Sequence, residues 1–124
     1  MPKSILVVDD SKIVLDISEF VLKSVGYRVS TAVGGNEALE ILGHKKVDLV
    51  LVDINMPGMD GYTLTSAIRS DDRLKDIPII IVTTEAEARD KQKGFDAGAD
   101  AYIVKPIVPE ELLGHVELLI GKAE

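Results

Sequence analysis

Acidic side chains follow two of the most apolar segments of the chain. Asp9 and Asp10 come directly after the run Ile5–Val8, and the run Leu49–Val52 ends on Asp53. A carboxylate at the end of a buried strand is costly unless a partner compensates its charge, and neighbouring carboxylates raise one another's pKa. A hard divalent cation resolves both problems, because it takes oxygen ligands and shares its coordination shell with phosphate. We therefore expect a Mg²⁺ (or Mn²⁺) site on these three aspartates.

Other polar groups follow the remaining apolar runs. Thr83 comes directly after the run Ile79–Val82, and Lys105 comes directly after the run Tyr102–Val104. Lysine binds phosphate as a compact charge, and aspartate is a covalent nucleophile in phosphoryl transfer. A metal and a lysine would offset the charge of the transferred group in the transition state. The set predicts that Asp53 becomes an acyl phosphate.

Short apolar runs alternate with helical patterns along the whole chain. The predicted strands are Ile5–Val8, Tyr27–Ala32, Leu49–Val52, Ile79–Val82 and Tyr102–Val104. Four of them are continuously apolar, which is typical of parallel strands covered on both faces. Repeated strand–helix alternation predicts an α/β fold with helices on both faces of a parallel sheet. In such folds, ligands bind at the carboxyl ends of the strands, where the aspartates lie.

Five segments have helical patterns: Ser11–Gly26, Asn36–Gly43, Gly61–Ser70, Glu85–Phe95 and Pro109–Gly121. In the first, Val14, Ile17, Val21 and Val25 fall on one face, which predicts the buried side. The segment Glu85–Phe95 has little apolar stripe, so we expect that helix to be lightly docked and comparatively mobile.

Length and composition bound the class of protein. The chain has 124 residues, no cysteine and a net charge of −7. This length suits one domain, and the absence of cysteine excludes disulfides and thiolate metal sites. The acidic balance argues against nucleic acid or an anionic membrane as the main partner. The N-terminal segment lacks the features of a signal peptide, and no apolar run approaches the ~20 residues of a membrane span, so we expect a cytoplasmic protein.

The motifs "VVDDS", "LVDINMPGMDG", "IIIVTT" and "YIVKP" resemble the receiver domain of two-component response regulators, over essentially the whole chain and in the family's order. The resemblance implies one receiver domain over residues 1–124, with a flavodoxin-like (βα)₅ fold and strand order 2-1-3-4-5. It implies that Asp53 accepts phosphoryl from a histidine kinase or phosphotransfer domain. It also implies that Mg²⁺ is held by Asp9, Asp10, Asp53 and the backbone carbonyl of Asn55. Asn55 lies two residues after Asp53, so its carbonyl could also be proposed as a ligand from this spacing.

The same resemblance assigns the remaining site residues. Lys105 and Thr83 would contact the phosphoryl oxygens, and Tyr102 would be a rotameric aromatic switch. The Lys105–Pro106 peptide would be cis. Asn55, Thr84 and Glu85 would modulate the site, and Thr84 departs from the Ala or Gly that is usual in the family. Phosphorylation would then change the surface made by the last two helices and the strand between them, which binds a protein target.

Alternatives remain open at this stage. The protein resembles stand-alone CheY-like receivers, which suggests control of a protein partner, with chemotaxis or motility as one role. It could instead be a receiver excised from a longer regulator, a pseudo-receiver scaffold, or an aspartyl-phosphate phosphatase. The phosphatase is disfavoured because Asn55 stands where such enzymes place a second aspartate. We expect no enzyme activity beyond self-phosphorylation and self-dephosphorylation of Asp53, and a monomer or weak phosphorylation-dependent dimer.

Two local assignments also have alternatives. Asp10 could cap the following helix instead of binding metal, and Ser11 could provide the same cap. His44, in a predicted loop, and His115 have no partners at ligand spacing, so neither is expected to be functional.

Overall fold

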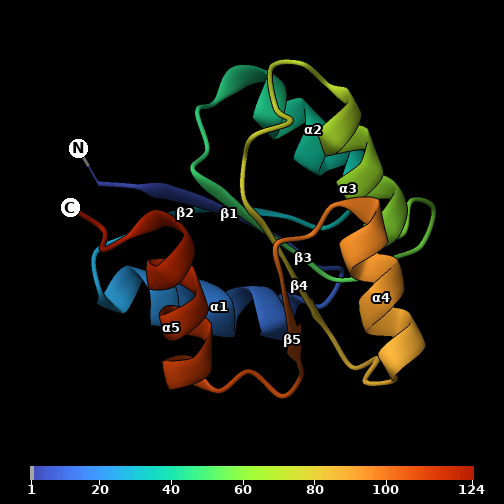
Figure 1. The fold of residues 1–124 in the computed structure, drawn as a ribbon. Helices are drawn as coiled ribbons and strands as arrows, with labels where there is room; N and C mark the ends of the chain where they lie inside the picture. Colours follow the sequence, from blue (N-terminus) through green and yellow to red (C-terminus); the bar gives the residue numbers. More distant parts are fainter. Residues whose placement is uncertain (1) are drawn as a thin grey trace.

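The computed structural model describes residues 2–124 as five strands alternating with five helices (Figure 1). In chain order they are β1 (Ser4–Val8), α1 (Lys12–Ser24), β2 (Arg28–Ala32), α2 (Gly35–His44), β3 (Leu49–Val52), α3 (Gly61–Ser70), β4 (Ile79–Thr83), α4 (Ala88–Ala97), β5 (Ala101–Val104) and α5 (Pro109–Ile120). The strands are parallel, in the order β2-β1-β3-β4-β5. The predicted fold class and strand order are confirmed.

Helices cover both faces of the sheet. In Figure 1, α1 and α5 lie on one side of the strands, and α2, α3 and α4 lie on the other. Successive side chains of a strand point to opposite faces, so Ile5 and Val7 join the core on the α1–α5 side while Leu6 and Val8 join the core on the α2–α3 side. Strands β3 and β4 are buried along their whole length, which explains their continuous apolar runs.

The buried face of α1 differs from the prediction. Ile17 is 45% exposed and Val25 is 48% exposed, although both were predicted to face the core. The residues of α1 that are buried are Leu15, Ser18, Val21 and Leu22. The prediction was right for Val21 and wrong for Ile17 and Val25, because a small polar residue, Ser18, lies in the packed face while apolar residues also occupy the outer face.

Helix α4 begins three residues later than predicted. Residues 85–87 form part of the loop after β4, and Glu87 has extended backbone angles as the N-cap of the helix. Gly94 is the one buried residue of α4, and an added Cβ there would lie 2.9 Å from Ile81 Cδ1. The expectation of a lightly docked helix agrees with this limited burial.

The two ends of the described chain lie side by side (Figure 1). The backbone amide of Lys3 donates a hydrogen bond to the carbonyl of Ala123 at 2.8 Å, and the Tyr27 hydroxyl donates to the carbonyl of Gly121 at 2.6 Å. These bonds fix the segment after α5 beside the first strands. No helix within residues 2–124 has the length and apolar character needed to cross a bilayer.

Candidate functional site

The carboxyl ends of the strands bring the predicted acids together. Val8 and Val52 are partners in the register of β1 and β3, so the residues that follow them leave the sheet side by side. The amide of Asp53 donates to the carbonyl of Val8 at 2.9 Å, which fixes the end of β3 against β1. Carboxylate oxygens of Asp9, Asp10 and Asp53 all lie within 4.8 Å of one another. The aspartates therefore form one cluster at this edge.

The cluster fits a hard divalent cation. Asp9 is 2% exposed and Asp53 is 5% exposed, whereas Asp10 is open to solvent. Two buried carboxylates with a third at the mouth supply the oxygen donors that Mg²⁺ prefers, and the open side leaves room for its waters. Of the two predicted caps for α1, Ser11 is the one that forms, since its hydroxyl accepts from the amide of Val14. Asp10 is thus not the N-cap of α1.

Lys105 supplies the positive charge that the structure shows at this site. Its Nζ lies 2.8 Å from Asp9 Oδ2 and 3.5 Å from Asp53 Oδ1. The lysine is carried there by β5, whose register with β4 pairs Val104 with Thr83, and its amide donates to the Thr83 carbonyl at 2.7 Å. The Lys105–Pro106 peptide is cis, as expected.

Electrostatics single out Asp53. Burial raises the pKa of the Asp53 carboxyl above its ordinary value, and the Asp9 carboxylate raises it further. Lys105 acts in the opposite direction, but its attraction does not outweigh burial and repulsion. The negative charge of Asp53 is therefore under-compensated by the side chains around it, and additional positive charge would stabilise its ionised form.

Glu85, in the loop after β4, forms backbone hydrogen bonds with both Thr83 and Tyr102. Thr83 is fully buried, and its hydroxyl accepts from the amide of Glu85 at 3.4 Å. The Tyr102 hydroxyl donates to the carbonyl of Glu85 at 2.8 Å, and burial raises the pKa of that tyrosine well above its usual range. The Glu85 side chain accepts from Asn55 Nδ2 at 3.0 Å, and Thr84 is exposed beside it. Glu85 thus links three of the predicted site residues.

Sequence reasoning missed two neighbours of the site. Gly61 begins α3 so close to the chain after β3 that an added Cβ would collide with the carbonyl of Asp53 and lie 2.8 Å from Cα of Ile54. Tyr62 donates to the carbonyl of Asp90 at 3.3 Å, and its ring lies 4.5 Å from the ammonium of Lys93. A sequence signal for Gly61 existed: Asp60 already caps the helix, so no turn requires a glycine at its first position.

Neither histidine belongs to a group of potential metal ligands within residues 2–124. Within residues 2–124, Asp9, Asp10 and Asp53 form the one group of potential metal ligands found. His44 is the last residue of α2, not part of a loop as predicted, and His115 lies within α5.

A parallel five-stranded sheet with buried aspartates and a lysine at its carboxyl edge defines a class of phosphorylation-controlled α/β domain. Comparison with known proteins specifies the class further. The model of the response regulator receiver domain family matches residues 5–117. The chain belongs to that family, as its motifs predicted. Receiver domains of two-component systems signal through phosphorylation, interact with histidine kinases and bind Mg²⁺ at an acidic site; they are signalling domains and not classical enzymes.

Individual relatives agree with this assignment. The DNA-binding dual master transcriptional regulator RpaA of Synechocystis is 36% identical over 124 residues, which are 100% of this chain and 51% of RpaA. The chain spans about half the length of the curated relatives it matches.

Two solved structures give the same picture. The chemotaxis protein CheY4 of Vibrio cholerae superposes with a TM-score of 0.92 at 35% identity, covering 96% of this chain and 99% of CheY4. The receiver domain of the sensor histidine kinase PA1611 of Pseudomonas aeruginosa, which has a magnesium ion coordinated in its active site cleft, has a TM-score of 0.89 at 31% identity, covering 98% of this chain and 100% of that domain.

Proposed function

We propose that Asp53 is the phosphoacceptor of this receiver domain. The observation that carries the proposal is a buried carboxylate whose charge is under-compensated, with a lysine ammonium 3.5 Å away and two further carboxylates within 4.8 Å. Phosphoryl transfer from a histidine kinase or phosphotransfer domain supplies the reaction. An oxygen of Asp53 attacks the phosphorus of the phosphohistidine, the N–P bond breaks, the electron pair stays on the imidazole nitrogen, and an acyl phosphate forms.

The carboxylates of Asp9, Asp10 and Asp53, with the backbone carbonyl of Asn55, would hold Mg²⁺ or Mn²⁺. A bound divalent cation supplies charge neutralisation for the phosphoryl oxygens. Lys105 contributes the second positive charge. Its ammonium, which donates to Asp9 at 2.8 Å, lies near enough to Asp53 to pair with an oxygen of the phosphoryl group. Asp9 orients that lysine, because it accepts from Lys105 with one oxygen and from the Ser11 amide with the other.

The hydrogen bonds of Glu85 suggest how phosphorylation of Asp53 would change the structure around Tyr102. The Thr83 hydroxyl accepts from the Glu85 amide and can donate its own proton to a phosphoryl oxygen on Asp53. Movement of Thr83 would shift the Glu85 backbone, whose carbonyl accepts from the Tyr102 hydroxyl. Two backbone groups of one residue therefore couple the phosphoryl site to the aromatic ring of β5. Asn55, Thr84 and Glu85 border the opening and would set how readily water or a donor reaches Asp53.

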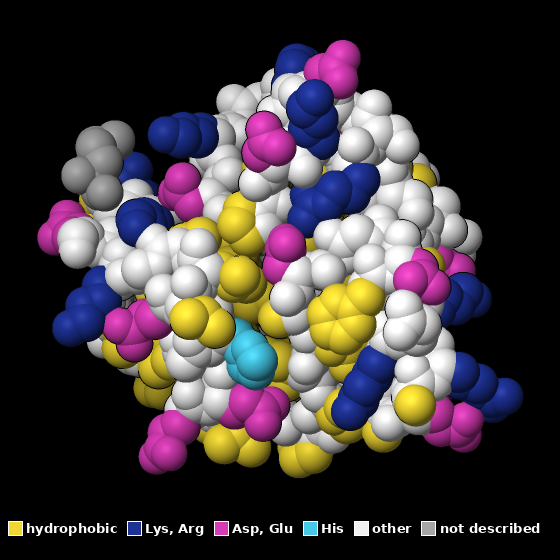
Figure 2. Space-filling model, viewed as in Figure 1, with side chains coloured by type: hydrophobic (Ala, Val, Ile, Leu, Met, Phe, Trp, Pro, Cys, Tyr) yellow, Lys and Arg dark blue, Asp and Glu magenta, His cyan; other side chains and the backbone are white. Residues whose placement is uncertain are grey.

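The output surface in this proposal is the face formed by α4, β5 and α5. Figure 2 shows hydrophobic side chains gathered on the face that these elements present in Figure 1. Phe95 is 45% exposed on α4, Val108 is 49% exposed before α5, and Leu118 is 82% exposed on α5. Exposed apolar groups favour a protein partner, and the net charge of −7 disfavours direct contact with nucleic acid.

Further parts of the proposal follow from the family. Residues 1–124 act as one receiver unit in the cytoplasm, as a monomer or a weak phosphorylation-dependent dimer. Chemotaxis or motility is the proposed behaviour, on the strength of the likeness to CheY4. The site catalyses its own phosphorylation from small phosphodonors and its own dephosphorylation, without turnover of another substrate. A phosphatase is disfavoured because Asn55 carries no acidic proton and its amide already contacts Glu85.

Acetyl phosphate with Mg²⁺, followed by mass measurement of the intact protein, tests the proposal. We expect wild type to gain the mass of one phosphoryl group and Asp53→Asn to gain none. Asp76→Asn is a matched control, because Asp76 is an exposed acid with no hydrogen bond or ion pair to the rest of residues 2–124, and it should gain the group normally. A phosphoryl group that persists in Asp53→Asn would refute the assignment, and sustained turnover of p-nitrophenyl phosphate would favour a phosphatase instead.

A further inference from the structure

A cavity lined by basic side chains lies at the opposite end of the strands from the aspartate cluster. It measures about 780 Å³ and lies at the amino ends of β1, β2 and β3. In a chain with 21 acidic and 14 basic residues, its lining includes a single carboxylate and five cationic side chains. These cations are Lys3, Lys23, Arg28, Lys45 and Lys46. We call this cavity the basic groove.

Three cations of the basic groove have no acidic partner. Arg28, Lys45 and Lys46 form no ion pair with any residue from 2 to 124. Two other cations are already engaged: Lys23 pairs with Glu19 at 2.8 Å on α1, and the Lys3 ammonium donates to a backbone carbonyl near the end of α5. The unpaired cations repel one another, so an anion that binds among them removes an electrostatic cost.

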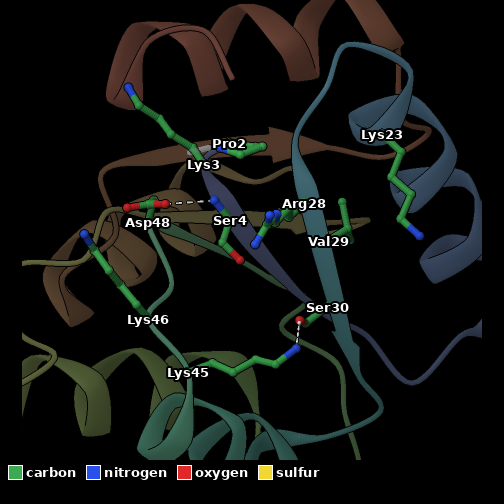
Figure 3. Close-up of a pocket in the computed structure, with 10 residues that line it drawn as sticks. All are labelled: Pro2, Lys3, Ser4, Lys23, Arg28, Val29, Ser30, Lys45, Lys46 and Asp48. Atoms are coloured by element: carbon green, nitrogen blue, oxygen red, sulfur yellow. Dashed lines mark hydrogen bonds between the residues drawn. The ribbon is translucent and has the colours of Figure 1, made fainter. Parts of the chain in front are cut away.

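Figure 3 shows how the unpaired cations of the groove are placed. Arg28 lies at the centre on β2, and the Lys45 ammonium donates to the Ser30 hydroxyl at 3.2 Å, which holds it at the same strand. Lys46 extends from the segment between α2 and β3 on the side of Asp48, and its ammonium points away from Arg28 and Lys45. The one carboxylate, Asp48, accepts from the Ser4 amide at 2.8 Å and forms no ion pair with a lysine of the groove.

We propose that the basic groove binds a compact anion carrying two linked phosphate groups, either free or as part of a nucleoside diphosphate. The planar guanidinium of Arg28 suits bidentate contact with one phosphate. Lys45, with the Ser30 hydroxyl beside it, suits the second phosphate as a point charge. A volume of about 780 Å³ lies within the usual range of small-molecule sites.

Other anions fit this lining less well. A nucleic acid would extend beyond the groove over the surface of a protein whose net charge is −7. An acidic peptide needs pockets for side chains or a strand edge along its length, whereas apolar contacts in the groove are limited to Val29 and Pro2. The proposal does not depend on phosphorylation of Asp53, because the two sites lie at opposite ends of the strands.

Nuclear magnetic resonance titration with inorganic pyrophosphate and with ADP, in EDTA at pH 7 and low salt, tests the proposal. We expect the amide signals of residues 28–30 and 45–48 to shift and those around Asp53 to stay unchanged. Arg28→Gln and Lys45→Gln should each weaken binding about tenfold or more. Lys75→Gln, which removes an exposed positive charge outside the groove, should change it less than twofold. Raising the salt concentration should weaken binding, because these charges are exposed.

Each outcome has a definite meaning. Equal affinity for pyrophosphate and ADP identifies the phosphate groups as the whole ligand, and tighter ADP binding adds a nucleoside contact; both support the proposal. Shifts confined to Asp9, Asp53 and Lys105 would overturn it, as would no binding at millimolar pyrophosphate or an undiminished affinity in Arg28→Gln. A hexaglutamate peptide that binds when pyrophosphate does not would replace the proposal with an acidic-peptide site. At physiological salt, Asp53→Asn should bind pyrophosphate normally, so failure at Asp53 and failure at the groove are distinguishable.

Discussion

Replacement of Asp53 by Asn should stabilise the metal-free protein, although the substitution removes a partner of Lys105. Carboxylate oxygens of Asp9 and Asp53 lie within 4.8 Å of each other, and two like charges at that distance repel by ~3.5 kcal/mol at an effective dielectric constant of about 20. Asp10 is exposed, so water screens its repulsion to about 1 kcal/mol. The Lys105 ammonium at 3.5 Å from Asp53 attracts by about 5 kcal/mol on the same scale.

These Coulombic contributions nearly cancel, so the cost of burying the Asp53 charge decides whether Asp53→Asn raises or lowers the free energy of unfolding. This agrees with the raised pKa of Asp53, whose largest cause is burial. A buried charge without full compensation costs about 1–3 kcal/mol, and we expect Asp53→Asn to raise the free energy of unfolding at pH 7 by about 1–2 kcal/mol. A carboxyl whose folded pKa exceeds its unfolded value binds its proton more tightly in the native state. The penalty in wild type is therefore complete above the folded pKa and disappears as pH falls below the ordinary value of 3.8.

Urea unfolding of wild type, Asp53→Asn and Asp76→Asn in EDTA measures this difference. The exposed Asp76 removes the same unit of net charge, and its substitution should change stability by no more than about 0.5 kcal/mol. Mg²⁺ at ten times its dissociation constant should add ~1.4 kcal/mol to wild type and less to Asp53→Asn, which lacks a carboxylate ligand. The reasoning is refuted if Asp53→Asn is less stable than wild type in EDTA, or if the difference does not shrink at low pH.

Three further substitutions probe the same framework. Lys105→Met leaves the buried Asp9 and Asp53 without their cation and should lower the free energy of unfolding in EDTA by about 3 kcal/mol, with partial recovery in Mg²⁺, as measured in urea; a loss that Mg²⁺ does not reduce would contradict this. Arg69→Ala removes a guanidinium that donates to three backbone carbonyls and one carboxylate, and thermal unfolding should show a loss of about 2–3 kcal/mol. Gly61→Ala forces a Cβ against the Asp53 carbonyl and should cost about 1–3 kcal/mol while slowing phosphorylation by acetyl phosphate; unchanged stability and rate would show that the backbone yields there freely.

The strands were predictable because burial on both faces leaves a continuous apolar run. All five predicted strands agree with the observed bounds to within one residue at each end. Helix faces were less predictable, as α1 shows. Ser18 is 1% exposed in its packed face, while Phe20 is 77% exposed on the opposite side. The predicted face of α1 therefore shares Val21 with the observed face but includes the exposed Ile17, because the fit of a small polar side chain against the sheet depends on neighbours distant in the sequence.

The candidate site was predictable where strand ends determine position and not where contacts depend on close packing. Asp53 and Lys105 follow recognisable strands, and parallel strands must bring their carboxyl ends to one edge. Glu85 was expected to be helical, but its backbone is held in a loop by Tyr102. The approach of Gly61 to the chain after β3 follows from the path of the α3 segment in three dimensions, which no local pattern records.

Charge is distributed unevenly over the sheet, with negative side chains at one end of the strands and positive side chains at the other. Carboxylates gather where the strands end, and unpaired cations gather where the strands begin. Strands of about five residues separate these ends by roughly 15 Å, which exceeds the Debye length of about 8 Å at physiological salt. The two ends should therefore act independently at that ionic strength and influence each other at low salt. Pyrophosphate affinity measured with wild type and Asp53→Asn at both salt concentrations tests this: a difference that persists at high salt would require a conformational link through the sheet.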